Sequence, residues 1–168
     1  MKKVFVLSVF LFVCMLIGFA CKKSNSTTNN TNSTSSTSGV PTNTTTTNFT
    51  VDATPASNPT VSVNNSSGNY AVTGIDGSHI YPQILLVFPG TSSPVSGGYA
   101  IVNTHGASPA AGQCELILTT TSGSYPASSG NVTVAAGTSS SAYFTNITCT
   151  NSNSSPTTHT VTGNVKWP

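Results

Sequence analysis

The apolar and polar positions divide the chain into three segments. An almost unbroken apolar run covers residues 4–19, and a tract that consists almost wholly of Ser, Thr and Asn covers residues 24–47. After this tract, short runs rich in Val, Ile, Thr, Tyr and Phe alternate with clusters of Gly, Pro, Ser and Asn. The pattern predicts a signal peptide over residues 1–20, a disordered linker over 21–47 and a folded domain over 48–168.

The third segment predicts an all-β fold, a single antiparallel β-sandwich. Short strands at regular spacing, separated by turn residues, are typical of sandwiches and barrels. No window has the sustained period of an amphipathic helix. The continuous apolar run 84–88 further predicts a strand buried on both faces. We place about nine strands, at residues 49–52, 60–64, 70–74, 84–88, 99–104, 113–121, 131–136, 143–149 and 158–167.

Period-two alternation places both cysteines of the domain on core faces. Glu115 alternates away from Cys114 and is therefore expected in solvent. An exported compartment permits disulfides, and a Cys114–Cys149 bond would close a loop of about 35 residues and stabilise the fold by about 3–4 kcal/mol. We favour this disulfide. The alternative is two separate buried thiols that pack as small hydrophobic groups.

The first segment has the order of a bacterial lipoprotein signal. Lys2 and Lys3 precede the apolar run, and the small residue Ala20 stands directly before Cys21. These residues resemble a lipobox, with Gly18 where Leu, Ile or Val is usual. The resemblance implies cleavage before Cys21 and lipidation of that cysteine. An uncleaved membrane helix is the alternative, although a comfortable span needs about 20 apolar residues.

Charge excludes nucleic acid as a partner. The chain has no arginine, and without residues 1–20 its three lysines balance its three acids. Phosphate contacts from Lys and Arg dominate nucleic-acid affinity, and the domain over 48–168 contains one lysine. The electrostatic footprint of a nucleic-acid-binding protein is therefore missing from this sequence.

No motif predicts catalysis, a metal site or a cofactor. His79, His105 and His159 lack the spacing of metal ligands. There is no G-x-S-x-G elbow, and a glycosidase needs two carboxylates that face one another. Asp76 lies in a turn-like Ile-Asp-Gly-Ser sequence. We therefore predict no catalytic residue, no metal and no cofactor.

Two tyrosines are candidates for stacking on a ligand such as a sugar. Tyr81 and Tyr125 each precede a proline near a predicted loop, where binding residues concentrate. The alternative is that these rings pack in the core, as aromatic residues of small sandwiches usually do. For Trp167, which alternates with valines, we expect the core position.

Segments 98–102, 125–134 and 159–165 look like parts of Bacteroidota lipoprotein domains of unknown function. The resemblance implies a small β-sandwich and an outer-membrane lipoprotein that faces the periplasm or the cell surface. No acidic residue follows Cys21 directly, which favours the periplasmic side. We predict a non-catalytic binding or structural module, with the membrane, a glycan or an envelope protein as partner. The alternatives are a carbohydrate-binding domain and, less favoured, a hydrolase.

Overall fold

The computed structural model describes residues 46–168, which form strands and no helix. The all-β prediction is confirmed for this part of the chain. Accordingly, no described helix has the length and apolar character that crossing a bilayer requires. The predicted signal peptide, Cys21 and nearly all of the linker lie outside the described residues. The strands are β1 (Asn48–Val51), β2 (Thr54–Pro55), β3 (Thr60–Ser66), β4 (Asn69–Ile75), β5 (Gln83–Pro89), β6 (Gly97–Ile101), β7 (Gln113–Thr120), β8 (Gly123–Pro126), β9 (Asn131–Ala135), β10 (Ser140–Thr150) and β11 (Thr158–Trp167).

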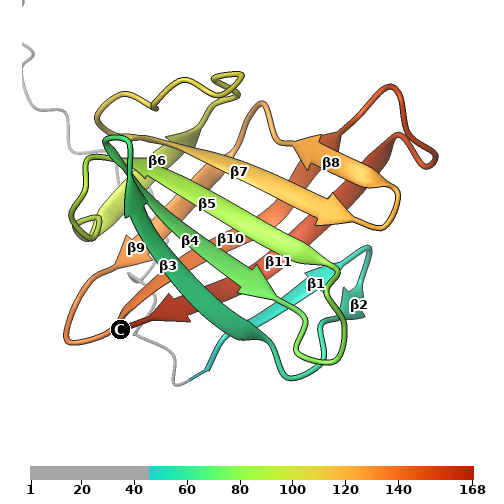
Figure 1. Ribbon diagram of the computed structural model, residues 1–168, viewed down its shortest axis with the longest axis horizontal. Coiled ribbons are helices and arrows are strands. Elements are labelled where there is room, and N and C mark those ends of the chain that lie inside the picture. Colours follow the sequence, from blue (N-terminus) through green and yellow to red (C-terminus); the bar gives the residue numbers. More distant parts are fainter. Residues whose placement is uncertain (1–45) are drawn as a thin grey trace, which may run out of the picture. The chain divides into compact units, whose positions relative to one another are not determined.

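The strands join edge to edge into one curled, mixed sheet (Figure 1). Their order is β2-β1-β11-β10-β9-β6-β7-β5-β4-β3, and β8 pairs with β7 beside this path. Every pairing is antiparallel except that of β6 with β7, which is parallel. The sheet therefore differs from the predicted antiparallel arrangement at one junction, where an irregular connection joins β6 to β7.

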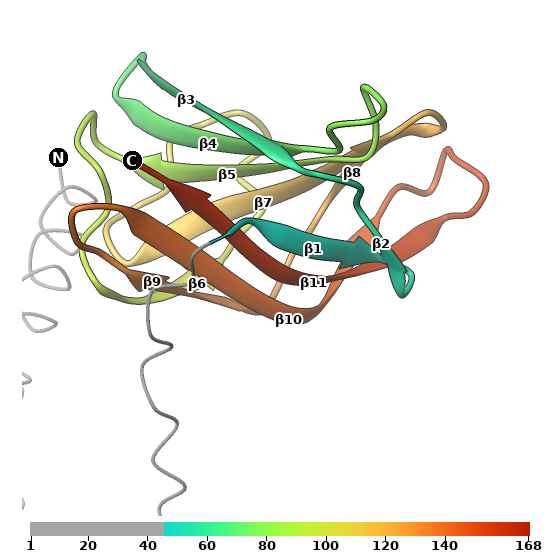
Figure 2. The ribbon, with the colours of Figure 1, turned by 90° about the horizontal axis from the view of Figure 1, so that it is seen from below.

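The curl of the sheet brings its distant strands across from one another. Figure 2 shows β3, β4 and β5 on one side and β1, β10 and β11 on the other. Strands β3 and β4 contact β11 although they lie far from it in the pairing order. The enclosed space is the hydrophobic core.

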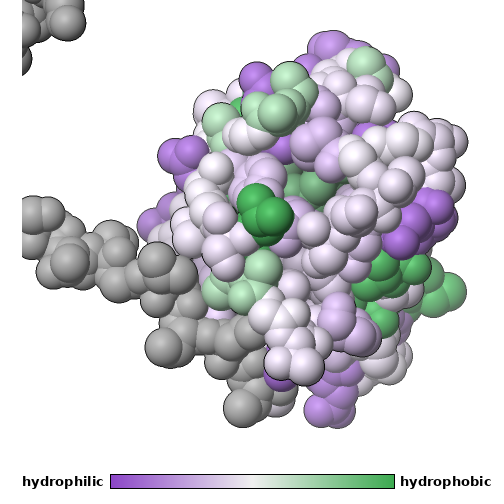
Figure 3. Space-filling model, turned by 90° about the vertical axis from the view of Figure 1, so that its left-hand side faces the viewer, coloured by the Kyte–Doolittle hydropathy of each residue, from purple (hydrophilic) through white to green (hydrophobic). Residues whose placement is uncertain are grey.

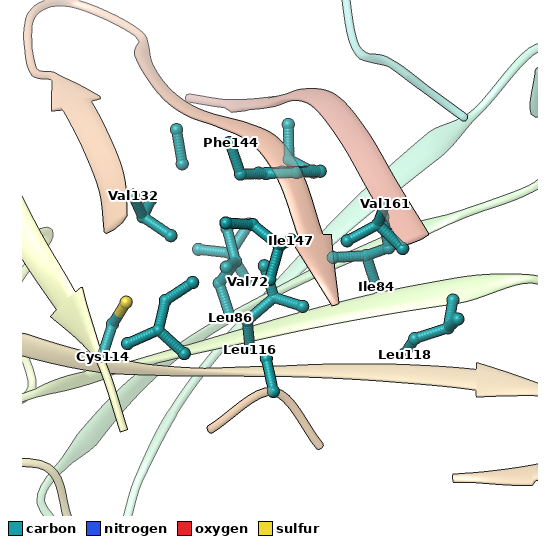
Figure 4. Packing of buried hydrophobic residues seen from close by; sticks show 14 of the residues in the cluster. Val72, Ile84, Leu86, Cys114, Leu116, Leu118, Val132, Phe144, Ile147 and Val161 are labelled. Atoms are coloured by element: carbon teal, nitrogen blue, oxygen red, sulfur yellow. The ribbon is translucent and has the colours of Figure 1, made fainter. Parts of the chain in front are cut away.

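Alternating side chains fill this core, as period-two strands require. Ile84, Leu86 and Phe88 of β5 are fully buried, and their neighbours in the strand are only half-buried. The expectation that residues 84–88 are buried on both faces is therefore wrong, since one face of β5 remains partly open to solvent. Leu116 and Leu118 of β7 are also fully buried (Figure 4).

An aromatic cluster lies at the end of β11. Trp167 is buried, as expected, and its Nε1–H donates to Ser93 Oγ at 3.1 Å. Its ring lies 6.5 Å from that of Tyr70 and 6.4 Å from that of Phe88, measured between centroids. Phe88 in turn meets Tyr99 edge-on at 5.1 Å. This cluster joins β4, β5, β6 and β11 through side chains rather than through backbone pairing.

Candidate functional site

The edge of β7 that faces away from β5 changes partner along its length. Parallel β6 pairs with this edge at Cys114, and antiparallel β8 pairs with it from Ile117 onward. A hollow of about 480 Å³ opens near this change of partner, between the loop after β6, the β7–β8 hairpin and the turn after β10. Glu115 lines it, and we call it the Glu115 pocket.

Glu115 is buried, with 6% of its surface exposed. The backbone N–H of Thr104 donates to its Oε1 at 2.8 Å, and the Thr104 hydroxyl lies between two acceptors, 2.6 Å from Oε1 and 2.5 Å from the carbonyl oxygen of Ala107. The expectation that Glu115 is solvated is therefore wrong. Its side chain does point away from the core face of β7, but the loop that carries Thr104 covers that other face.

A second hollow, of about 280 Å³, contains Tyr81 in its lining. Tyr81 is 38% exposed, and the adjacent Ile80 is more exposed still. Pro82 and Thr120 line the same hollow, which we call the Tyr81 pocket. Of the two predicted stacking residues, Tyr81 is the one whose ring is accessible to a ligand.

Tyr125, by contrast, is fully buried. Its ring meets His159 edge-on, with 4.5 Å between the centroids, and its hydroxyl donates to the carbonyl of Pro156 at 3.1 Å. The buried ring offers no face to a ligand, so Tyr125 does not remain a stacking candidate. The sequence suggested a loop position for Tyr125, but the residue belongs to β8, and its side chain packs into the core.

Asp52 holds the start of β11 in place. Its Oδ1 accepts the backbone N–H of Thr160 at 2.8 Å, and its Oδ2 lies 2.6 Å from Nδ1 of His159. The hydrogen bond from Thr160, followed by that from His159, lowers the pKa of the Asp52 carboxyl. This carboxylate therefore serves to join the turn after β1 to β11.

Asp76 has a comparable structural role. It is buried, its Oδ2 accepts the backbone N–H of Ser57 at 3.0 Å, and its Oδ1 accepts that of Ser78 at 2.8 Å. These two backbone bonds, the one from Ser57 first, lower the pKa of the Asp76 carboxyl. Asp76 therefore stabilises a turn, as the sequence predicted.

The histidines are distributed over different parts of the domain. His79 is exposed, 3.7 Å from Asp76 Oδ1, whereas His159 pairs with Asp52 and His105 lines the Glu115 pocket. Within residues 46–168 no three His, Cys, Asp or Glu side chains gather closely enough to hold a metal ion.

Cys114 and Cys149 are separate buried thiols, so the predicted disulfide is absent. The backbone of Leu118 hydrogen-bonds to the Cys149 thiol. Leu118 lies four residues from Cys114 along β7, which is about 13 Å in a strand, whereas bonded cysteines need Cα atoms within about 7 Å. Cys114 and Cys149 both lie on the core side of the sheet, but at different positions along the strands.

We expect both thiols to resist alkylation in the native protein. Burial raises the pKa of each to about 12, so the reactive thiolate is scarce at pH 8. Iodoacetamide should modify Cys114 and Cys149 only after unfolding in guanidinium, as read by peptide mass mapping. A cross-linked peptide pair two daltons lighter than the reduced pair, found without reductant, would contradict the structure.

Comparisons with known proteins give no relative from which a role could be carried over. No family model matches the chain, and neither the curated proteins nor the solved structures include a match. The resemblance to Bacteroidota lipoprotein domains therefore stays a prediction.

The Glu115 pocket was not predicted from the sequence, although the sequence contains one signal for it. Glu115 is an acidic residue within an otherwise apolar run, Cys-Glu-Leu-Ile-Leu. An acid at such a position, if covered, needs hydrogen-bond donors from elsewhere in the chain. The loop that supplies those donors has no sequence pattern that would have placed it over β7.

Proposed function

We propose that the chain is a lipid-anchored protein of the cell envelope whose domain is a non-catalytic binding or structural module. The observation that carries the proposal is that the three acidic side chains of residues 46–168 are engaged in hydrogen bonds within the domain. Asp52, Asp76 and Glu115 each accept hydrogen bonds from the chain's own backbone. General acid–base catalysis needs such groups poised at a substrate, and here they hold loops and strand ends.

The anchor in this proposal is Cys21, with residues 1–20 as its signal peptide and the Ser/Thr/Asn tract as a tether. As a flexible coil, a tether of this length would span about 25–30 Å. The domain would be displayed from the outer membrane, towards the periplasm or outside the cell. We also propose to class the domain as a β-sandwich, because β3 and β4 face β11 across a shared core.

Membrane fractionation tests the anchor. Wild-type protein should remain in the membrane pellet through salt and carbonate washes, because acyl chains are held by hydrophobic burial. Cys21→Ser should release the protein or leave an unprocessed precursor, and Cys14→Ser serves as the matched control that should behave as wild type. A Cys21→Ser protein that is processed and retained like wild type would contradict the proposal.

Carbohydrate binding is the alternative, and the Tyr81 pocket is the observation that favours it. An accessible tyrosine ring beside a hollow can stack on the apolar face of a sugar, while hydroxyls such as that of Thr120 bond to its edge. The face of the domain in Figure 3 is mainly hydrophilic or neutral, and its hydrophobic residues form small, separate spots. That face gives no comparable support to docking of a large apolar partner.

A glycan array with the mature chain, kept unlipidated by Cys21→Ser, tests this alternative. Tyr81→Ala should weaken any binding about tenfold, the equivalent of about 1.4 kcal/mol, whereas Tyr81→Phe should retain it because the ring remains. Val95→Ala, at another exposed apolar residue, is the control. Binding that survives Tyr81→Ala would show that the Tyr81 pocket is not the site.

A further inference from the structure

We propose that the Glu115 pocket binds a ligand through a primary ammonium group. The inference goes beyond the proposed function and does not depend on the lipid anchor. It rests on three features of the pocket: an unpaired buried carboxylate, the polar groups around it and an apolar wall.

The first feature is the charge of Glu115. Both of its hydrogen bonds fall on Oε1, and none is made to Oε2 within the described part of the chain. No salt bridge reaches Glu115 from residues 46–168, in which Lys166 is the only lysine and arginine is lacking. Oε2 is not among the fully enclosed side-chain atoms that lack a partner, so it can be reached from solvent, and a mostly buried carboxylate without a counter-charge is costly. A cation bound at Oε2 would offset that cost.

The second feature is the set of polar groups that share the pocket. Asn151 is fixed, because its Nδ2 donates to the carbonyl of Ser124 and its Oδ1 accepts the backbone N–H of Asn153. Thr150 and Ser152, which carry hydroxyl groups, line the same hollow. An ammonium group has three donors, so neutral oxygens of residues that share the pocket can accept the hydrogen bonds that Oε2 does not.

The third feature is the wall formed by Ile117 and Pro126, which lie opposite one another in the β7–β8 pairing. The wall can pack against the carbon atoms that carry the ammonium group. A hollow of about 480 Å³ is within the range of small-ligand sites, about 300–1,000 Å³. It is large enough for one sugar ring or one long side chain.

A metal ion fits these groups less well. Calcium takes about six to eight oxygen ligands and magnesium demands an octahedral set, and such sites usually combine several carboxylates. His105 also lines the pocket, but within the described residues no group of three or more His, Cys, Asp or Glu side chains gathers there to hold a metal ion. The chemistry of the pocket is therefore that of an organic cation, which could come from an amino sugar or from a lysine side chain of a polypeptide.

Paired ligands that differ by the ammonium group test the proposal. The ¹⁵N–¹H spectrum of the mature chain with Cys21→Ser is followed during titration with glucosamine against glucose, and with Nα-acetyl-lysine amide against its Nε-acetylated form. The probe is the amide of Thr104, whose N–H donates to Glu115 Oε1. An ammonium ligand should shift this signal saturably while its neutral counterpart does not. Which ammonium ligand binds identifies the source.

Two variants distinguish charge recognition from general loss of structure. Glu115→Gln keeps an acceptor for Thr104 but removes the charge, and should weaken binding at least about tenfold. Asp52→Asn removes one charge outside the pocket and should leave binding unchanged. If Glu115→Gln fails to fold, the salt dependence of wild-type binding replaces it, since affinity for a cation should fall as ionic strength rises. Equal shifts from the neutral ligands, or no shift of Thr104 with any of them, would overturn the proposal.

Discussion

Gly163→Ala is expected to destabilise the domain by about 3 kcal/mol or more, because it adds a side chain where there is no room and strains the backbone as well. Gly163 lies in β11 opposite Phe49 of β1. A Cβ at this position would lie 2.3 Å from the carbonyl oxygen of Asn48 and 2.5 Å from Cα of Phe49. Both are backbone atoms, and φ of +145° is unfavourable for an L residue. Strand β1, with the fully buried Phe49, would have to move.

Gly98→Ala is the matched control for this experiment. Gly98 also lies in a strand, but a Cβ there would meet no heavy atom within 4 Å. The free energy of unfolding should change by no more than about 0.5 kcal/mol. Urea unfolding followed by circular dichroism measures both variants. A Gly163→Ala protein as stable as Gly98→Ala would contradict the β1–β11 pairing.

Trp167→Ala should cost about 3–5 kcal/mol, the usual loss for truncating a fully buried tryptophan. The ring contacts those of Tyr70 and Phe88, and its removal would leave a cavity beside them. Within this loss, the hydrogen bond from Nε1 to Ser93 contributes about 1 kcal/mol, which Ser93→Ala measures separately.

The adjacent residue provides the control for Trp167. Lys166 alternates to the other face of β11 and is only half-buried, so Lys166→Ala should change stability by no more than about 0.5 kcal/mol. Trp167 is the one tryptophan of the chain, and its fluorescence in the wild type should shift to longer wavelength on unfolding. Emission typical of an exposed indole in the folded protein would contradict the buried position.

Hydrophobic alternation was sufficient to place most of the strands and the inward faces of β7 and β11. It was wrong for part of β10, where it puts Tyr143 on the core face with Ile147: a register shift between Phe144 and Ile147 buries Phe144 instead and leaves Tyr143 only half-buried. It did not reveal β2, which has two residues and ends in Pro55, or β8, which has four and ends in Pro126. Proline weakens a strand signal because it cannot donate to the ladder. The parallel pairing of β6 with β7 could not be predicted either, because strands that pair across a long loop leave no local pattern in the sequence.

At the candidate site, too, alternation predicted which way side chains point but not what they contact. Alternation correctly put Cys114 and Cys149 on core faces, but it could not give their separation along the sheet. It also put Glu115 on the opposite face of β7 from Cys114, yet it could not show that the loop of Thr104 covers that face. Periodicity determines the direction of a side chain from its own strand. What lies against that side chain depends on tertiary packing.

The proposal that this chain is an envelope module anchored at Cys21 is tested most directly by the intact mass of the protein extracted from cell membranes with detergent. The extracted chain should begin at Cys21, lack residues 1–20 and carry the additional mass of a lipid on that cysteine. Treatments that cleave ester-linked acyl chains should lower the additional mass by the mass of those chains. A chain that retains residues 1–20, or one that begins at another residue without lipid, would contradict the proposal.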